Sequence, residues 1–326
     1  MYRRNCFKFA ISSLLSMLVF SAHAQDVNSY PSKPIRIIVN FPPGGTVDVM
    51  TRGVAQKLTE KWGQAVVVDN RPGAGGNIGA QAVASAEPDG YTLLATPPGP
   101  MTINQYLYKD MRFDPAKLSS VIMMASVPNA IAARIDFPAN NVKELIAYTK
   151  ANPGKVSFGS QGNGSTSHLT GQMFATMVGS DMMHIPFKGE GPALTEILGG
   201  RVDLFLGNIS AVLKLYQNKQ IKLLGVASPK RSPMANEIPA SQEFGMPDFV
   251  ASAWFAIAAP PGTPAPIVNK LNAAILEALK LPDTQQKMAA LGGEVVGGSP
   301  ADMTTMVIAE RARWKKVIET ANVKLD

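Results

Sequence analysis

Three glycine-rich turns hold the residues best suited to chemistry, and each turn lies between a short apolar run and a helix-like pattern. They are Pro42-Pro43-Gly44-Gly45-Thr46, Gly73-Ala74-Gly75-Gly76-Asn77 and residues 159–167. Glycine lets backbone N–H groups approach a ligand closely, and a helix N-terminus favours negative charge. In open α/β sheets such turns lie at the carboxyl ends of strands, where ligands bind. They indicate a site for a small anion, although tight turns and close helix packing use glycine in the same way.

The third turn is the most specific of the three. It contains three glycines, three serines, one threonine and two side-chain amides within nine residues. Because His168 follows directly, Ser165 or Ser167 with His168 also suggests an exported serine hydrolase. Such chemistry needs a third group that orients the histidine, and the neighbouring sequence offers no acid. A histidine in the first helical turn that ties down the loop is the favoured alternative.

Two further polar residues have two interpretations each. Asp48 either caps the helix that follows the first turn or fixes the turn itself, and we expect the cap. Lys188, in Ile185-Pro186-Phe187-Lys188-Gly189, either attracts an anion or is simply solvated.

Several kinds of chemistry lack their residues in this sequence. After removal of a leader the chain contains no cysteine and only two histidines, His168 and His184, without metal-ligand spacing. Disulfides, thiolate catalysis and a metal site are therefore not expected. The G-x-S-x-G elbow and the phosphate-binding G-x-x-x-x-G-K-[ST] loop are absent, and Ile78 stands where a dinucleotide fingerprint needs its third glycine. We expect no cofactor.

The N-terminus has the pattern of a secretory signal peptide. Arg3, Arg4 and Lys8 precede a short apolar run, and Ala22-His23-Ala24 forms a small-x-small cleavage site. Cleavage after Ala24 gives a mature chain that begins at Gln25. The one cysteine, Cys6, lies ahead of the apolar run, so we do not expect a lipoprotein. The sequence predicts an exported, soluble protein.

The charge is mildly positive. Residues 1–24 contain three basic and no acidic residues, so their removal lowers the formal net charge from +7 to +4. Lysines and arginines are scattered along the chain, without the clustered stripe of a nucleic-acid-binding protein. Nucleic acid is therefore excluded as a partner, whereas an anionic small molecule would be attracted.

Strand and helix patterns alternate along the first part of the mature chain. Residues 35–39, 66–68 and 91–95 predict strands, and residues 47–62 and 78–84 predict the helices between them. This βαβαβ order favours a parallel sheet with helices on both faces. After about residue 126 a second set follows, with strands at 156–158, 183–185, 204–206 and 223–227 and helices at 142–152, 168–178, 193–198 and 211–216. Asn141 and Glu144 form a capping-box pattern before the first of these helices.

The last part of the chain is more helical. Thr263-Pro264 and Ser299-Pro300 each place an N-cap before a proline and predict helices at about 264–280 and 300–321. Two apolar, non-helical stretches at 121–133 and 251–259 are interpreted as crossings between two lobes. Lobe 1 comprises residues 25–126 plus 251–326, to which the C-terminal helices return, and lobe 2 comprises residues 127–250.

Motifs in a fixed order carry a family resemblance. They include Tyr30-Pro31-Ser32-Lys33-Pro34-Ile35-Arg36, Phe41-Pro42-Pro43-Gly44-Gly45, Asn70-Arg71-Pro72-Gly73-Ala74-Gly75-Gly76, Pro88-Asp89-Gly90-Tyr91, Asn152-Pro153-Gly154-Lys155, Phe187-Lys188-Gly189, Leu198-Gly199-Gly200-Arg201-Val202-Asp203 and Pro260-Pro261-Gly262-Thr263-Pro264. Over residues 30–320 the chain resembles the Bug receptors, the extracytoplasmic solute receptors of tripartite tricarboxylate transporters.

The resemblance implies an α/β, type II-like periplasmic binding protein that is not an enzyme. Each of its two lobes is a mostly parallel sheet flanked by helices, and the cleft between them closes on the ligand. Ligands of the family are mostly small carboxylates: di- and tricarboxylates, acidic amino acids and aromatic acids. Its partners are the membrane components of a transporter, or a sensor protein. We expect a monomer in the periplasm.

The resemblance also implies which residues meet the ligand. One carboxylate lies between the first turn of lobe 1 and the Gly/Ser loop of lobe 2, partly through water. The corresponding residues are Pro43, Gly44, Gly45, Thr46, Asp48, Gly162, Asn163, Gly164, Ser165, Ser167 and His168. Thr96 and Asn208 lie in variable turns that would meet the distal part of the ligand. After Leu204-Phe205-Leu206 many members carry an acid, but this chain has Gly207, which favours a plain carboxylate over a ligand with an ammonium group.

Overall fold

The computed structural model describes residues 27–325. The predicted signal peptide, residues 1–24, and its cleavage point after Ala24 lie outside the described residues. Pro31–Asp326 forms one compact unit, which holds every strand of the described residues. None of the helices described is both long enough and apolar enough to cross a membrane.

Strands and helices alternate in the order that the sequence predicts, with two additions. The strands are β1 Ile35–Val39, β2 Val66–Asn70, β3 Thr92–Thr96, β4 Ser119–Arg134, β5 Ser157–Ser160, β6 Met183–Pro186, β7 Leu204–Asn208, β8 Ile221–Val226, β9 Ser252–Ala259 and β10 Glu294–Gly297. The helices are α1 Thr46–Trp62, α2 Asn77–Ala84, α3 Val142–Ala151, α4 Thr166–Val178, α5 Glu190–Leu198, α6 Ile209–Gln217, α7 Ala265–Lys280, α8 Pro282–Ala290 and α9 Pro300–Thr320. The sequence interpretation missed α8 and β10.

The sheet is mixed. β2, β1 and β3 are parallel neighbours, and β6, β5 and β7 form a second parallel set, as the βαβ order predicts. β9 pairs antiparallel with β3 and β4, and β4 pairs antiparallel with β7, β8 and β10. The α/β prediction is therefore confirmed, whereas the parallel arrangement is limited to the two sets. A parallel pair needs a long crossover connection, and the extended segments β4 and β9 join the sets without one.

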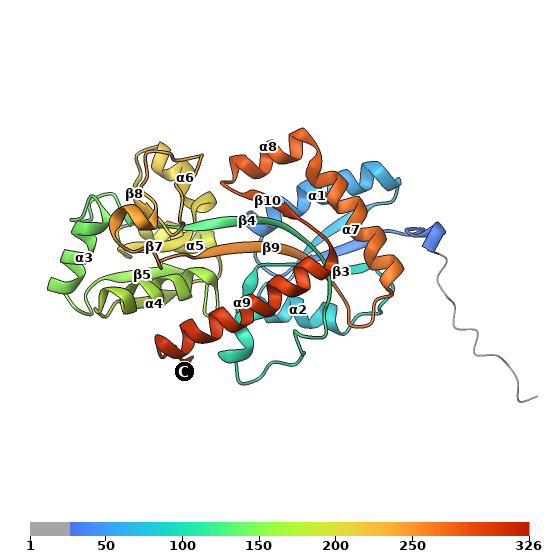
Figure 1. Ribbon diagram of the computed structural model, residues 1–326, viewed down its shortest axis with the longest axis horizontal. Helices are drawn as coiled ribbons and strands as arrows, with labels where there is room; N and C mark the ends of the chain where they lie inside the picture. Colours follow the sequence, from blue (N-terminus) through green and yellow to red (C-terminus); the bar gives the residue numbers. More distant parts are fainter. Residues whose placement is uncertain (1–26, 326) are drawn as a thin grey trace, which may run out of the picture. The chain divides into compact units, whose positions relative to one another are not determined.

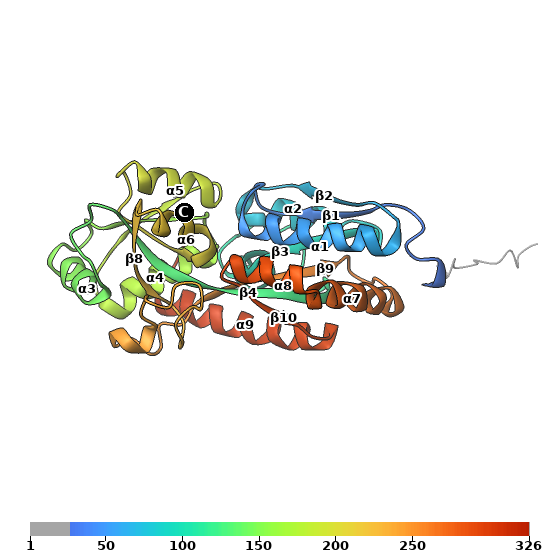
Figure 2. The same ribbon diagram turned by 90° about the horizontal axis from the view of Figure 1, so that it is seen from above.

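The two stretches interpreted as crossings lie in β4 and β9. Residues 119–128 of β4 pair with β9, and residues 129–134 pair with β7 and β8, so one strand takes part in both sets. Figures 1 and 2 show β4 and β9 running side by side between the two groups of elements. This pairing agrees with the role expected of these segments, and the lobe boundaries drawn through them remain a prediction.

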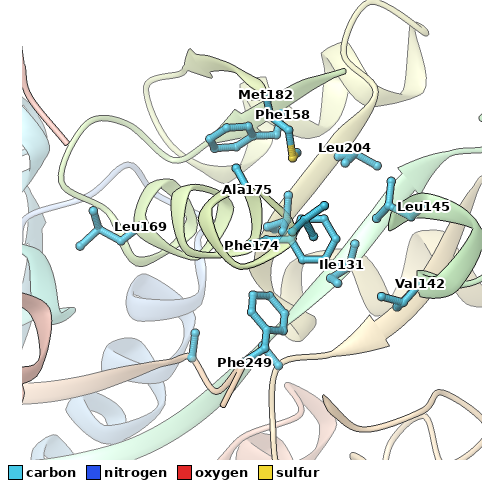
Figure 3. Packing of buried hydrophobic residues seen from close by; sticks show 14 of the residues in the cluster. Ile131, Val142, Leu145, Phe158, Leu169, Phe174, Ala175, Met182, Leu204 and Phe249 are labelled. Carbon is cyan, nitrogen blue, oxygen red and sulfur yellow. The ribbon is translucent and has the colours of Figure 1, made fainter. Parts of the chain in front are cut away.

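Two of the apolar clusters in the interior of the described residues bear on the arrangement of the two strand sets. One contains Leu94 of β3 and Ala256 of β9, and the other contains Phe158 of β5 and Phe174 of α4 (Figure 3). Helix α9 takes part in both: Met303 and Val307 belong to the first cluster, Trp314 and Ile318 to the second. A helix of 21 residues is about 30 Å long, which is enough to reach both. The end of α9 therefore packs on the second cluster, which is built mainly from elements of the predicted lobe 2.

The helix starts are partly as predicted. The Asn141 side chain accepts a hydrogen bond from the amide of Glu144, and Ser299 caps α9 in a capping box. Glu144, however, accepts from the Asn140 amide and the Asn141 side chain, not from the amide of its own N-cap residue. Helix α7 begins at Ala265 with Pro264 as its N-cap residue, so Thr263 is not the N-cap; its hydroxyl donates to the carbonyl of Pro260.

Candidate functional site

Two cavities adjoin at the carboxyl ends of the strands. The first, of about 330 Å³, is lined by Phe41, Pro42, Pro43, Gly44, Gly45, Thr46, Val47, Pro97, Gln161, Lys188, Gly189, Glu190, Gly191, Pro192, Asn208 and Phe255. The second, of about 590 Å³, is lined by Asn40, Phe41, Pro42, residues 72–76, Tyr108, Gln161, Gly162, Asn163 and residues 186–189. Both cavities share Phe41, Pro42, Gln161, Lys188 and Gly189. All three glycine-rich turns predicted from the sequence thus reach one of these two spaces.

The first cavity lies at the N-terminus of α1. Gly45 is the N-cap residue, and no side chain caps the helix. Gly44 has a φ of +81°, which favours glycine, and its amide donates to Asp48 Oδ2 over 2.9 Å. The expected N-cap role of Asp48 is therefore wrong. Asp48 instead fixes the turn that precedes the helix.

Two further groups hold the Asp48 carboxylate in place. The Arg52 side chain and the Asn70 amide both donate to it. Burial acts to raise the pKa of Asp48, but the hydrogen bonds from Arg52, Gly44 and Asn70 outweigh it and keep the pKa below its usual value. An ionised carboxylate that is not part of the lining of the first cavity thus holds the turn in place.

A carboxylate of the protein itself occupies the start of α1. The backbone amide of Thr46 donates to Glu190 Oε2 over 3.2 Å, and the Thr46 hydroxyl lies 3.1 Å from Oε1. Gln161 Nε2 donates to Oε1 over 2.7 Å, and Asn208 Nδ2 donates to the same oxygen over 2.6 Å. The donors come from the turn after β1, the end of β5 and the end of β7, so three separate segments converge on one anion.

Neutral donors alone hold this carboxylate. Among the ion pairs of residues 27–325, none involves Glu190. The residue is partly exposed, but its carboxyl group is enclosed, and this burial raises its pKa although Asn208 and Thr46 donate to it. The site therefore accommodates a carboxylate without a neighbouring cation.

The serines of the third turn build the loop. Ser165 is the N-cap of α4; its hydroxyl accepts from the His168 amide and donates to the Gly162 carbonyl over 2.6 Å. The Ser167 hydroxyl accepts from the Gln161 amide over 2.9 Å. Both serines are buried and neither lines a cavity. Their hydrogen bonds fix the positions of Gln161, which lines both cavities, and Gly162, which lines the second.

His168 lies behind this loop. Its ring stacks on that of His184 with the centroids 3.9 Å apart, and its Nδ1 accepts from the Gly164 amide. Burial, with a smaller effect of His184, lowers the pKa of His168 to about 3, so the ring is neutral at physiological pH. The favoured interpretation, a histidine that ties down the loop, is confirmed. Ser165 contacts the His168 backbone and not its ring, which is not the geometry of an activated nucleophile.

The second turn packs tightly against the third. A Cβ atom on Gly75, whose φ is +61°, would come within 2.7 Å of the Asn163 carbonyl oxygen. Tyr108 donates its hydroxyl to the same oxygen over 2.9 Å. Glycine in the second turn therefore allows the two turns to approach, which is the packing alternative for this motif, while the turn also forms a wall of the second cavity.

Metal-binding residues do not gather in the described part of the chain: residues 27–325 hold no group of three or more histidine, cysteine or acidic side chains placed to share an ion.

Comparison with known proteins identifies the family. Residues 50–323 match the model of the tripartite tricarboxylate transporter family receptor. The chain belongs to this receptor family. The resemblance seen in the sequence motifs is confirmed, and the family is one of solute receptors rather than enzymes.

Solved receptors of high similarity share the fold. Rpa4515 from R. palustris, solved with adipate, is 38% identical with a TM-score of 0.88, over 90% of this chain and 99% of that one. The periplasmic binding protein BugD is 35% identical with a TM-score of 0.85, over 90% and 99%. MatC from Rhodopseudomonas palustris, solved with malate, is 30% identical with a TM-score of 0.84, over 89% and 100%.

In this family member the structure brings together about half of the predicted site residues. Pro43, Gly44, Gly45, Thr46 and Asn208 line the first cavity, and Gly162 and Asn163 line the second. Asp48, Thr96, Gly164, Ser165, Ser167 and His168 line neither. Thr96, for example, is 0% exposed, accepts from Asn40 Nδ2 and donates to the Pro97 carbonyl.

Sequence reasoning missed Glu190 and gave Gln161 no separate role. Glu190 stands between two glycines at the start of a helix, where an acid is expected to face solvent and favour the helix dipole. Its contact with Thr46 spans 144 positions of sequence. Gln161 could have been predicted as a ligand-binding residue, because it is a side-chain amide in the most specific of the three turns.

Proposed function

We propose that this member of the family is an exported periplasmic receptor that captures a small organic carboxylate in the first cavity. The observation that carries the proposal is the Glu190 carboxylate itself, which four donors from Thr46, Gln161 and Asn208 hold at the start of α1. Because these neutral donors hold the carboxylate of Glu190 without a cation, they suit the carboxylate of a ligand as well. The adipate and malate of the two solved relatives belong to the same chemical class.

The placement of these donors suits a cleft that closes on its ligand. Thr46 lies after β1 in the proposed lobe 1, whereas Gln161 follows β5 and Asn208 ends β7 in the proposed lobe 2. A ligand carboxylate that contacts both sides favours the closed arrangement, because the contacts of one side are lost when the lobes separate. Residues 25–126 plus 251–326 and residues 127–250 are the lobes that we propose to move about β4 and β9.

The rest of the first cavity suits a short carbon chain. Phe41, Pro42, Pro97 and Phe255 supply apolar wall, and the exposed Lys188 lies at the rim shared with the second cavity. Apolar contacts fix the chain of the ligand while a few polar groups fix its end. A lysine at the rim would attract a second carboxylate.

The expected affinity is moderate. About four hydrogen bonds to a charged carboxylate contribute roughly 6–12 kcal/mol before costs. Immobilising the ligand and closing the lobes costs at least about 4 kcal/mol. The remainder, roughly 2–8 kcal/mol, corresponds to dissociation constants from tens of millimolar to about micromolar from the carboxylate alone.

Calorimetric titration with adipate, malate and their dimethyl esters tests the proposal. The acids should bind with a saturable heat and the esters should bind far more weakly, because an ester lacks the negative charge that the donors hold. Equal binding of acid and ester would contradict a site centred on a carboxylate, and so would turnover of the ester without saturable binding of the acid.

We propose that the receptor delivers its ligand to the membrane components of a tripartite transporter, with a sensor protein as the other kind of partner. A monomer that starts at Gln25 in the periplasmic fraction is expected. N-terminal sequencing of that fraction and size-exclusion chromatography check these points, and a full-length chain retained in the cytoplasm would contradict export.

A further inference from the structure

We propose that Glu190 is a built-in competitor: its carboxylate occupies the place of the ligand carboxylate at α1, and the ligand must displace it to bind. The inference rests on the proposed function, because it assumes that the first cavity takes a carboxylate. The inference assigns to Glu190 a role in setting the affinity for the ligand, and none of the sequence motifs indicates this role.

The position of the Glu190 carboxylate is that of a ligand. One oxygen lies at the Thr46 amide, the first amide of an α1 whose N-cap Gly45 offers no side chain, and the other accepts from both Gln161 and Asn208. A Cβ atom on Gly45 would lie 3.7 Å from Glu190 Oε2, in van der Waals contact, so the carboxylate lies directly beside this glycine. An external carboxylate would need the same donors.

A buried polar atom independently indicates that the site lacks a partner. Asn208 is 2% exposed, lines the first cavity and donates to Glu190, but its Oδ1 has no hydrogen-bond partner among the described residues. Buried side-chain oxygens of this kind are normally satisfied. The buried Oδ1 atoms of Asn40, Asn104 and Asn129 also lack a partner, but only that of Asn208 belongs to a side chain that holds Glu190. A ligand with a hydroxyl or amide group beside its carboxylate would supply a donor for this oxygen.

Glu190 and a ligand carboxylate cannot share the donors. Two carboxylates in one enclosed site repel each other, and no cation pairs with Glu190 among the described ion pairs. When a ligand enters, the side chain of Glu190 must therefore leave.

The surroundings of Glu190 allow this movement. It is the first residue of α5, and Lys188, Gly191 and Pro192 beside it are exposed. No atom lies within 4 Å of a Cβ built on Gly191. A change of side-chain rotamer takes the carboxylate towards solvent without unfolding the helix. The exposed Lys188 lies two residues before Glu190 in the sequence.

The competitor lowers the measured affinity because only the molecules whose donors are free can bind the ligand. If only a fraction f of the protein has the donors free, the apparent dissociation constant is the intrinsic constant divided by f. Removal of Glu190 sets f close to one, so the affinity for a carboxylate rises without a new contact.

The test compares Glu190→Ala, Glu190→Gln and the matched control Glu196→Gln by calorimetric titration with adipate and malate. Glu196 lies on the same helix and pairs with Arg201 away from the cavities. Glu190→Ala should bind at least one of the acids ten or more times tighter than the wild type, Glu190→Gln should gain less, and the control should be unchanged. Glu190→Gln keeps the shape of the side chain, so it serves if the alanine variant does not fold.

The outcomes separate this inference from the proposed function. Equal or weaker binding by the Glu190 variants, with normal binding by the wild type, would overturn the inference alone; it would mean that Glu190 contacts the ligand or latches the lobes. Binding by the variants but not by the wild type would support it. Failure of all these proteins to bind either acid would overturn the proposed function and the inference with it.

A spectroscopic measurement follows Glu190 directly. In protein labelled with ¹³C at the glutamate carboxyl groups, the Glu190 signal is identified by its loss in Glu190→Gln. Addition of adipate should move this signal towards the value of solvent-exposed glutamates. A signal that stays in place while adipate saturates the protein would overturn the displacement.

Discussion

The first and third glycine-rich turns look alike in sequence, but they differ in how the first backbone amides of the following helix are hydrogen-bonded. In the first turn Gly45 leaves α1 without a side-chain cap, and the Thr46 amide reaches a carboxylate in the cavity. In the third turn Ser165 caps α4, and the hydroxyls satisfy amides of the loop itself. A helix N-terminus can hold an external anion only where its amides are not already used.

The comparison shows that glycine content does not distinguish an anion site from a well-packed turn. Between these two turns the residue at the N-cap makes the difference: Gly45 leaves the amides of α1 available, and Ser165 uses an amide of α4. Gln161 is the contribution of the third turn to the anion, and the serines contribute by holding that residue in place.

The largest effect is expected in the first turn. Gly45→Val should abolish binding of adipate and malate, because the branched side chain fills the space next to the anion. The backbone angles of Gly45, φ −74° and ψ 167°, are allowed for valine, so the fold should be retained. Calorimetry and circular dichroism measure both properties. Gly53→Ala, at a position of α1 with open space around it, is the control and should bind as the wild type does.

The histidines His168 and His184, which lie behind the third turn, should make the free energy of unfolding sensitive to acid. Burial lowers the pKa of His168 to about 3, with a smaller effect of His184, and lowers that of His184 to about 4. Unfolded histidines titrate near 6.5, so between pH 6.5 and about 4 the unfolded state binds more protons and the free energy of unfolding falls with falling pH. From pH 7 to 5 the two histidines together should lower it by roughly 4 kcal/mol.

Two carboxylates behave differently in this window. The raised pKa of Glu190 has the opposite effect, because the folded state then gains a proton above the unfolded pKa. Asp48, with its lowered pKa, keeps its contribution until the pH falls below about 3.8. Urea unfolding of the wild type and of His184→Gln at pH 7, 6 and 5 checks the assignment. The variant should lose about half as much stability, and an equal loss in both proteins would contradict it.

The smallest effect is expected at Ser165. Ser165→Ala removes the cap of α4 and should lower the free energy of unfolding by about 1 kcal/mol. The affinity for adipate should change by less than about twofold, because no hydrogen bond to the ligand is lost. Denaturation and calorimetry of the same preparation measure the two quantities. A tenfold loss of affinity would place the hydroxyl on the ligand, as the family resemblance implies.

Much of the fold follows from the sequence, because β1, α1 and their successors carry clear apolar periods between turn residues. The antiparallel pairing of β4 and β9 does not follow, since an apolar run shows that a segment is buried but not which strand lies beside it. Helix α8 is short and mostly polar, and Leu281 precedes its first proline, so it lacks the serine or threonine before a proline from which α7 and α9 are predicted.

The site follows from the sequence only in part. The backbone turn at Gly44 and Gly45 is local and was predicted, whereas the burial of Glu190 depends on the meeting of three distant segments. Asp48 shows the same limit on a smaller scale: an acid in the first turn of a helix has two local partners, and only the structure distinguishes them.

A crystal structure of the complex with adipate tests the central claim most directly. The account predicts a ligand carboxylate that accepts hydrogen bonds from the Thr46 amide and from Gln161 and Asn208, with the Glu190 side chain withdrawn from these donors. Adipate bound against the serines of residues 159–167, with Glu190 still hydrogen-bonded to Thr46, would contradict it.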